Sequence, residues 1–266
     1  MTSEPIIVLS LGAGVQSSTL ALMAAHGELD PMPDCAIFSD TGAEPKPVYD
    51  WLDKLEAMMP FPIHRVQWAD GLLENIKGAV KGGRFAGAPF YTENEDFNRS
   101  DKEGQLRRQC TREFKVQPIT RKLRDLLGLE KGQRAGKEVR VIQYIGISLD
   151  EVVRMKPSRD KWIEHRWPLI DKRMTRWDCM RWLEEKGYPV PPKSSCTFCP
   201  YHSNHEWRWL KTNDPEGWNQ AVEVDRLIRG GVRGTKHALY LHRDMVPLEE
   251  VDLSTDTERG QMSLLG

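Results

Sequence analysis

A loop of small residues near the start of the chain has the composition of an anion-binding site. It follows an apolar run that begins at Ile6, and a helix-forming run comes after it. Gly12 and Gly14 remove side chains where backbone must approach a ligand closely, and Ser17 or Ser18 can cap the helix. The free amides and the positive helix end would hold a phosphate. The loop residues expected at this nucleotide site are Ser10, Leu11, Gly12, Ala13, Gly14, Gln16, Ser17 and Ser18.

Two better-known phosphate loops compete with this interpretation. The P-loop G-x-x-x-x-G-K-[ST] requires a lysine that this loop lacks. The dinucleotide fingerprint G-x-G-x-x-G is met from Gly12 except at its third glycine, where Ser17 stands, and Asp40 closes the next apolar run. From the loop alone, a Rossmann-type enzyme therefore stays open, and so does a strand, turn and helix that bind no nucleotide.

A second group of polar residues follows the next predicted strand, 35–40. The carboxyl ends of parallel strands are where α/β sheets bind ligands. Asp40 or Glu44 can hold Mg²⁺, which binds through one or two carboxylates and phosphate oxygens. Downstream, Lys115 and Arg154 are long cations that can reach a phosphate chain and stabilise charge on a leaving pyrophosphate. The residues expected at the nucleotide from this strand end are Ser39, Asp40, Thr41 and Gly42.

The third group contains cysteines. Cys196 and Cys199 are spaced C-x-x-C in a proline-flanked loop that offers two thiolates to one metal, and Cys110 lies far upstream. Five cysteines, an odd number, in a chain with no apparent signal peptide do not form a disulfide framework, so metal or redox chemistry is favoured. Cys35 falls in a predicted strand and Cys179 in the middle of a predicted helix, so both are expected to pack in the core.

Zinc is the alternative metal for the same segment. With two histidines the cysteine pair forms the pattern C-x₂-C-x₂-H-x₂-H, which is tighter than the usual zinc-finger spacing. The residues of this pattern are Cys196, Cys199, His202 and His205. An iron–sulfur cluster and Zn²⁺ both remain open from the spacing.

The order of the predicted elements indicates an α/β fold with a mostly parallel, twisted sheet and helices on both faces. Strands and helices alternate, so the polar groups named above would gather at one edge of the sheet. The first predicted strand begins at Ile6, and the others cover 35–40, 63–67 and 139–147. The first predicted helix follows the loop, and the others cover 46–59, 71–81 and 112–127.

The same pattern suggests three parts. We expect an α/β nucleotide-binding domain over residues 1–171, in which residues 82–105 form a mobile loop. A smaller helical subdomain with the C-x-x-C segment would cover 172–253, starting with a helix over 175–186. Residues 254–266 would form a flexible tail.

Composition and charge exclude several classes of protein. The chain has 266 residues, 29% charged and 39% hydrophobic, with a formal net charge of −1. It has no apolar run near the roughly 18 residues of a membrane span and no signal-peptide pattern, so we expect a cytoplasmic protein without membrane association. Lys and Arg concentrate over 107–124 and 154–176. Such a surface can attract a polyanion or be merely solvated.

Taken together, these segments resemble the PP-loop ATP pyrophosphatase superfamily. Residues 10–17 are similar to its loop S-x-G-G-x-[DQ]-S, with Gln16 where many members carry Asp. Residues 40–45, 110–118 and 146–154 resemble, in order, the motifs D-T-G-x-x-x-P, C-x-x-x-x-K-x-x-P and G-x-R-x-x-E/Q-x-x-x-R. These motifs are those of the phosphoadenosine phosphosulfate (PAPS) reductase-like, or CysH-like, family.

The resemblance implies a nucleotide site and a reaction. ATP with Mg²⁺ would be cleaved to AMP and pyrophosphate, and an acceptor oxygen would be adenylylated. Gly146 and Ser148 would add to the nucleotide site. The catalytic residues implied are Ser17, Asp40, Lys115 and Arg154.

The resemblance also implies a cofactor and an acceptor. Cys110, Cys196 and Cys199 would hold a [4Fe–4S] cluster with one open iron, as in the tRNA-thiolating branch, where the open iron is thought to carry sulfide. The enzyme would then be a sulfurtransferase acting on a nucleic acid, tRNA or DNA. Relatives of this kind travel with phages, plasmids and CRISPR loci.

Two other functions remain as alternatives. Sulfonucleotide (APS or PAPS) reductases of this family use a cysteine in a C-terminal segment, but the last cysteine here is Cys199, which disfavours that activity. The other alternative is a zinc-bearing, non-enzymatic nucleic-acid-binding module.

The end of the chain carries a separate motif. Residues 261–265, Gln-Met-Ser-Leu-Leu, resemble the Q-x-[SD]-L-[LF] peptide by which bacterial replication proteins dock on the sliding clamp. A short apolar anchor on a mobile tail suits docking in a groove. The alternative is a tail whose leucines fold back on the protein's own surface.

Overall fold

The computed structural model describes residues 4–93 and 103–254. The chain divides into two compact units, each assembled from separate segments. The first unit contains Met1–Asp40, Pro47–Gln67 and Lys115–Ser194, and the second contains Thr41–Lys46, Trp68–Phe114 and Ser195–Gly266.

The first unit is built on a five-stranded sheet in the order β3-β2-β1-β6-β7, in which every neighbouring pair is parallel. The register places Val8 opposite Cys35 on one side and Ile6 opposite Val141 on the other. The strands are β1 (Ile6–Leu11), β2 (Cys35–Asp40), β3 (Ile63–Gln67), β6 (Val141–Ile145) and β7 (Ile163–Arg166). The predicted parallel α/β fold is confirmed.

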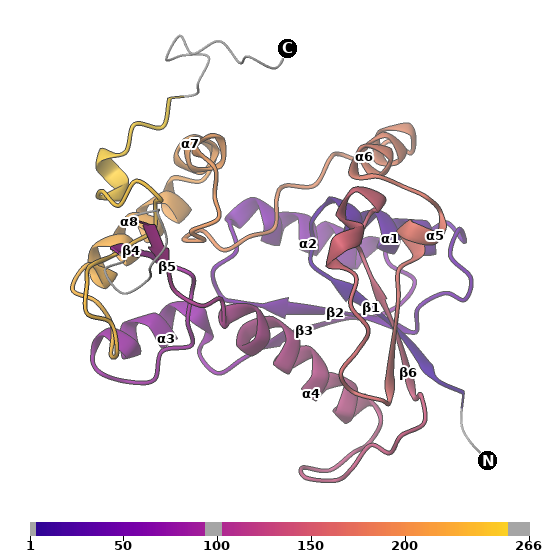
Figure 1. Ribbon diagram of the computed structural model, residues 1–266. Helices are drawn as coiled ribbons and strands as arrows, with labels where there is room; N and C mark the ends of the chain where they lie inside the picture. Colours follow the sequence, from indigo (N-terminus) through magenta and orange to yellow (C-terminus); the bar gives the residue numbers. More distant parts are fainter. Residues whose placement is uncertain (1–3, 94–102, 255–266) are drawn as a thin grey trace. The chain divides into compact units, whose positions relative to one another are not determined.

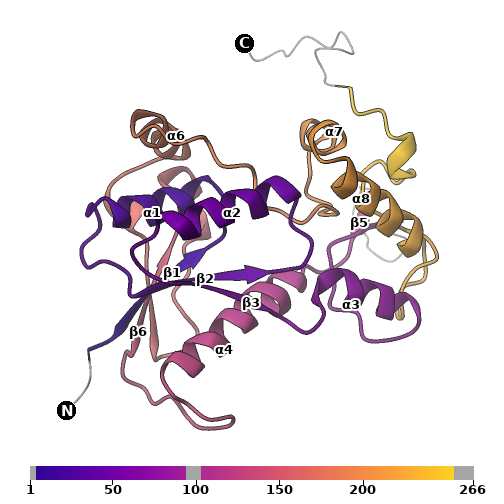
Figure 2. The same cartoon turned by 180° about the vertical axis from the view of Figure 1, so that it is seen from behind.

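Helices cover both faces of this sheet (Figures 1 and 2). On one face lie α1 (Val15–Ala25), α2 (Lys46–Met58) and α6 (Arg176–Glu185), and α4 (Gln117–Leu126) lies on the other. Alternate residues of the central strands supply the two apolar layers. Leu9 and Phe38 pack with α1 and α2, whereas Val8 and Ile37 pack with α4.

Several elements depart from the expected ones. The helix expected over 112–127 begins as a π-helix, η1 (Arg112–Val116), before α4. The strand expected over 139–147 is shorter. No element was predicted between this strand and the helix over 175–186, where the structure has a 3₁₀ helix, η2 (Leu149–Arg154), the edge strand β7 and the short helix α5 (Pro168–Asp171).

The second unit packs helices against a small antiparallel sheet in the order β5-β4-β8. Its core is aromatic and includes the buried Phe90, Phe114, Phe198 and Trp207. Its elements are α3 (Gly71–Val80), β4 (Tyr91–Glu93), β5 (Glu103–Gln105), α7 (Asn204–Asn213), α8 (Pro215–Ile228), β8 (Leu239–Tyr240) and the 3₁₀ helix η3 (Leu248–Glu250). Within the described ranges, no helix combines the length and apolar character needed to cross a bilayer.

The two units divide the chain differently from the expected boundary at residue 171. Helix α6 belongs to the unit of the parallel sheet because it packs on α1, and residues 68–114 belong with the C-terminal helices. The segment expected as a mobile loop over 82–105 contributes β4 and β5, while residues 94–102 lie outside the described part. In the expected tail, residues 255–266, including the clamp-like motif, also lie outside it.

A buried carboxylate ties three segments of the second unit together. Asp225 of α8 is 1% exposed, and its Oδ1 accepts the N–H of Leu241 at 2.9 Å. Its Oδ2 accepts the N–H of Leu248 at 3.0 Å and pairs with Arg229 one turn later. The guanidinium also lies 4.3 Å from the centre of the Tyr240 ring. Removing this carboxylate would leave a cation and two amides without their acceptor.

We therefore expect Asp225→Ala to lower the free energy of unfolding by about 3–5 kcal/mol, the usual cost of breaking a buried ion pair. The matched control is Glu249→Ala, which removes an exposed pair with Arg226 and should leave the unfolding midpoint nearly unchanged. Urea denaturation followed by tryptophan fluorescence measures both. Equal midpoints for the two variants would contradict the role assigned to Asp225.

Candidate functional site

The strand order of the first unit contains a switch point, where open α/β sheets have a crevice outside the carboxyl ends of the strands. The chain runs outward from β1 to β2 and β3, then returns to the other side of β1 to form β6 and β7. Connections therefore leave the carboxyl ends of β1 and β6 in opposite directions. Open α/β sheets bind ligands at such a switch point. Helix α1 starts just after β1 and η2 just after β6, so the predicted loop and the segment 146–154 both border this crevice.

The first turn of α1 is built to receive an anion. The helix begins at Val15 with Gly14 as its N-cap, without a side-chain cap and without an acidic residue in the first turn. Ser17 and Ser18 were expected as caps, but they lie inside the first turn instead. Ala13 has a φ of 55°, so the backbone bends into the left-handed region just before the helix. The first-turn amides and the positive helix end therefore border the crevice.

Both serines have structural partners. The Ser17 hydroxyl accepts the N–H of Gly12 at 3.1 Å and donates to the carbonyl of Gly14 at 3.3 Å, which closes the loop on itself. Ser18 is fully buried, and its Oγ accepts the indole N–H of Trp51 at 2.9 Å. Ser17 can thus shape the phosphate loop, whereas Ser18 anchors α1 on α2.

Gly146 lets the segment after β6 pack directly on this turn. A Cβ at Gly146 would lie 2.9 Å from the backbone N of Ser17, 3.0 Å from its Cα and 3.2 Å from the carbonyl carbon of Gln16. Real Cβ atoms do not approach backbone this closely. Gly146 was expected at the nucleotide site, and the structure shows it in contact with the loop.

The side chain of Gln16 is bound on three sides. Its Nε2 donates to the Oγ of Ser148 and to the Oε2 of Glu151, each at 3.3 Å, and its Oε1 accepts from Arg176 at 2.9 Å. An amide suits this position because it can accept from a cation and donate to a carboxylate at once. Gln16 and Ser148, both expected at the nucleotide site, are thereby brought together. Arg176, which was not among the residues expected at this site, completes the group.

The two predicted catalytic cations have different surroundings. The side chain of Arg154 is 62% exposed and pairs with Glu151, three residues earlier in η2. Lys115 is half-buried in the π-helix η1, a rare conformation that is frequent at functional sites.

Asp40 ends β2, beside β1, as expected. It is half-buried, and its Oδ1 accepts the hydroxyl of Tyr49 at 2.7 Å. Ser39 before it is buried. Of the residues after it, Thr41 is buried and Gly42 is exposed with a φ of 70°, and both belong to the second unit.

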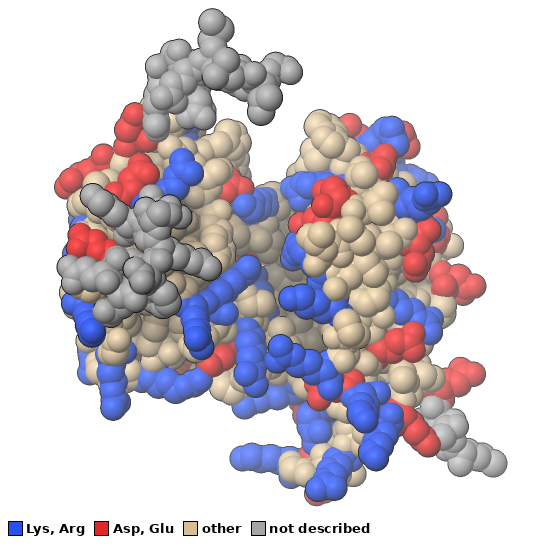
Figure 3. Space-filling view, in the orientation of Figure 1, with Lys and Arg blue, Asp and Glu red and all other residues tan. Residues whose placement is uncertain are grey.

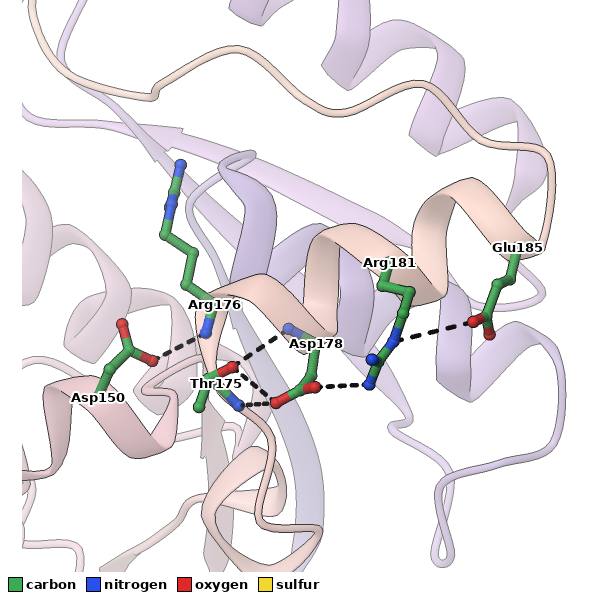
Figure 4. A network of polar contacts seen from close by, with 6 residues as sticks. All are labelled: Asp150, Thr175, Arg176, Asp178, Arg181 and Glu185. Carbon is green, nitrogen blue, oxygen red and sulfur yellow. Dashed lines mark hydrogen bonds and ion pairs between the residues drawn. The ribbon is translucent and has the colours of Figure 1, made fainter.

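The start of α6 is held by a polar network (Figure 4). Thr175 and Asp178 form a capping box, and the carboxylate of Asp178 also pairs with Arg181. Asp150 accepts the backbone N–H of Arg176 at 2.8 Å. Burial raises the pKa of Asp150, but hydrogen bonds and the positive charge of Arg176 outweigh it and hold this pKa below its usual value. The network fixes the backbone from which the Arg176 side chain extends toward Gln16.

The three candidate metal-binding cysteines all lie in the second unit. Cys196 and Cys199 are half-buried in a turn closed by the N–H of Cys199 and the carbonyl of Cys196 at 2.9 Å. The Sγ of Cys196 lies 3.2 Å from the Oγ1 of Thr41, directly after Asp40 in the chain. Cys110 and Cys196 pack against the same aromatic core. Within residues 4–93 and 103–254, however, no group of three His, Cys, Asp or Glu side chains is arranged to hold a metal ion.

The histidines of the zinc pattern have other surroundings. The Nε2 of His202 lies 2.8 Å from the Oγ of Ser195, and its ring packs edge-on against Trp207 with centroids 4.5 Å apart. His205 is exposed on α7. His202 would have to leave Ser195 to bind a metal through Nε2.

Cys35 and Cys179 are core residues, as predicted. They are 5% and 0% exposed in the first unit. Burial raises the pKa of Cys35 to about 11 and that of Cys179 to about 12. Because thiolates are the metal-binding and nucleophilic form, neither residue suits such a role.

Lys and Arg side chains gather on the face shown in Figure 3. In the basic segment 154–176 of the first unit, six of the eight Lys and Arg are exposed. The two that are not are Arg166, which pairs with Glu164, and Arg176, which contacts Gln16. The six exposed residues are Arg154, Lys156, Arg159, Lys161, Lys172 and Arg173.

We expect Gly146→Ala to displace the loop, because the new Cβ meets backbone and not a flexible side chain. The stability loss should be about 1–3 kcal/mol, typical of overpacking, with weaker binding of inorganic pyrophosphate. The control is Gly78→Ala in α3, where a Cβ meets nothing within 4 Å. Thermal melting and calorimetric titration measure both effects. Unchanged pyrophosphate binding in Gly146→Ala would contradict the importance of this contact.

Comparison with known proteins gives remote structural likenesses. No protein family profile matches the chain, and no curated protein sequence matches it significantly. The phosphate complex of PAPS reductase from Candida auris is similar with a TM-score of 0.45 and 16% identity, covering 71% of this chain and 76% of that chain. The U34-tRNA thiolase NcsA from Methanococcus maripaludis, solved with its [4Fe–4S] cluster, is similar with a TM-score of 0.38 and 13% identity, covering 100% of this chain and 83% of that chain.

Proposed function

We propose that this protein is a PP-loop ATP pyrophosphatase of the PAPS reductase-like kind, which adenylylates an acceptor and supports its thiolation. The proposal rests on one observation: the uncapped first turn of α1 borders the crevice between β1 and β6, with Gly146 packed against its backbone. Backbone amides and a positive helix end are ready-made for a phosphate chain.

In the proposed reaction, an oxygen of the acceptor attacks the α-phosphorus of ATP. The bond from this phosphorus to the oxygen bridging to the β-phosphate breaks, and pyrophosphate leaves with the bonding electron pair. The loop amides and Lys115 would stabilise the charge that develops on the pyrophosphate. Asp40, at the end of β2, would hold Mg²⁺ together with phosphate oxygens. Arg154 would have to leave Glu151 to join them.

We further propose that Cys110, Cys196 and Cys199 come together as the ligands of a [4Fe–4S] cluster, a rearrangement that binding requires because the described side chains are not arranged to hold a metal ion. Thiolates suit iron, and these three are the cysteines outside the buried core of the first unit. All three belong to the second unit, where the Sγ of Cys196 also contacts the Oγ1 of Thr41 at 3.2 Å. When bound, such a cluster would supply sulfur-transfer chemistry.

A nucleic acid is the acceptor that the basic surface favours. The exposed Lys and Arg of residues 154–173 give the first unit a local positive field that attracts phosphate backbones although the whole chain is nearly neutral. Residues 200–266 contain no cysteine of the kind that a thioredoxin-linked sulfonucleotide reductase uses, which disfavours that alternative.

The nucleotide reaction is tested by product analysis. With ATP and Mg²⁺, we expect AMP and pyrophosphate as products, separated by anion-exchange chromatography. Lys115→Ala should weaken ATP binding by about 1.5–3 kcal/mol, the range for a charge-assisted hydrogen bond. Ser17→Ala should also weaken it, because the Ser17 hydroxyl closes the loop through Gly12 and Gly14. The control is Lys161→Ala, an exposed cation outside the loop. Release of ADP and phosphate would contradict the proposal.

The metal is tested on protein purified without oxygen. Cys110→Ala, Cys196→Ala and Cys199→Ala should each lose iron and the broad visible absorbance of a cluster. Cys35→Ala and Cys179→Ala should keep both, because these thiols are buried and protonated. A colourless protein whose single zinc is lost in His202→Ala would instead support the zinc-bearing binding module.

A further inference from the structure

The guanidinium of Arg176 has a different environment from the other arginines of its region. It extends from the first residue of α6 and is half-buried, and its Nη1 donates to the neutral Oε1 of Gln16 at 2.9 Å. Among the described residues it forms no ion pair. By contrast, Arg154 pairs with Glu151, and Arg181 pairs with Asp178.

A half-buried cation with a neutral acceptor is an unusual arrangement. Arginine has five N–H donors and stays charged in proteins, so a guanidinium withdrawn from water normally faces a carboxylate. Among the described residues neither nearby acid forms an ion pair with the guanidinium, although its charge contributes to the lowered pKa of Asp150. Asp150 binds the backbone N–H of Arg176, and Glu151 pairs with Arg154. The guanidinium thus keeps donors and charge available for an anionic ligand.

The hydrogen bond to Gln16 places the guanidinium of Arg176 beside the first turn of α1. Gln16 lies in the first turn of α1, next to Ser17 and the backbone that Gly146 packs against. A group within hydrogen-bond distance of the Gln16 side chain therefore borders the uncapped turn. In Figure 4 the Arg176 side chain extends away from Asp150, Thr175 and Asp178, whose contacts hold the backbone at the start of α6.

Glutamine at position 16 leaves the positive charge of Arg176 uncancelled. A carboxylate at position 16 could accept from Arg176, but it would neutralise the guanidinium and repel Glu151. The amide of Gln16 accepts from Arg176 while donating to Ser148 and Glu151, so it orients the guanidinium without cancelling its charge.

We propose that Arg176 is a phosphate-binding residue, which holds the pyrophosphate part of ATP from the α6 side of the crevice. This inference rests on the proposed function. Its planar fork can donate two parallel hydrogen bonds to phosphate oxygens, a geometry that lysine cannot reproduce. Because the pyrophosphate is the leaving group, the same contact stabilises the charge that it gains when the bond to the α-phosphorus breaks.

The test compares ATP, inorganic pyrophosphate and AMP as ligands of the full-length protein by calorimetric titration. Arg176→Gln should weaken ATP and pyrophosphate binding by about 10- to 100-fold, as for the loss of charge-assisted hydrogen bonds, while AMP binding changes by less than about 3-fold. Arg176→Lys should recover part of the loss because it keeps the charge but not the fork. Arg181→Gln, on the same helix, is the control and should bind all three ligands as the wild type does.

A second variant separates ligand binding from a structural tether. Gln16→Ala removes the link between α1 and Arg176 but keeps the cation. If Arg176 binds phosphate, Gln16→Ala should lose less ATP affinity than Arg176→Gln. If Arg176 only tethers α6, both variants should lose ATP and AMP binding equally, with equal falls in melting temperature, and the inference would be overturned.

The outcomes also separate this inference from the proposed function. A wild-type protein that binds neither ATP nor pyrophosphate refutes the nucleotide site itself, and the inference with it. A wild-type protein that binds ATP and releases pyrophosphate, with Arg176→Gln unchanged in affinity, refutes the role of Arg176 alone.

Discussion

The contact between Gly146 and the first turn of α1 is the constraint on which the candidate site depends. With no side chain at residue 146, the segment after β6 reaches the backbone of Gln16 and Ser17. That approach brings the loop after β1 and the segment after β6 together at the switch point of the sheet. It also carries Ser148 and Glu151 to the side chain of Gln16.

Next to this contact, a neutral amide side chain lies between a cation and a carboxylate. Gln16 lies between the cation Arg176 and the carboxylate Glu151, and its amide forms a hydrogen bond with each. Since Arg176 starts α6, this hydrogen bond joins the helix to the first turn of α1, and Cys179 and Leu183 of the same helix are buried in the core with α1. This packing explains why α6 belongs to the unit of the parallel sheet.

The second unit has its own organisation, in which buried polar groups fix irregular segments. Asp225 replaces missing backbone partners for the N–H groups of Leu241 and Leu248. The C-x-x-C turn is held similarly, because the N–H of Thr197 donates to the carbonyl of Ala43 at 2.7 Å and its hydroxyl donates to Gln220. The periodicity of apolar residues in the sequence does not predict these hydrogen bonds, because they join segments far apart in the chain.

Local pattern in the sequence was enough to predict the parallel sheet, the loop after β1 and the two core cysteines. Buried strands, glycines and apolar helix faces leave a signal within a few residues. The sequence did not reveal β7 or the division of the chain into units, because an edge strand in a charged segment and the pairing of residues 68–114 with C-terminal helices depend on tertiary contacts. The place of Arg176 in the candidate site could not be predicted for the same reason. It lies 160 positions from Gln16, and only the fold makes them neighbours.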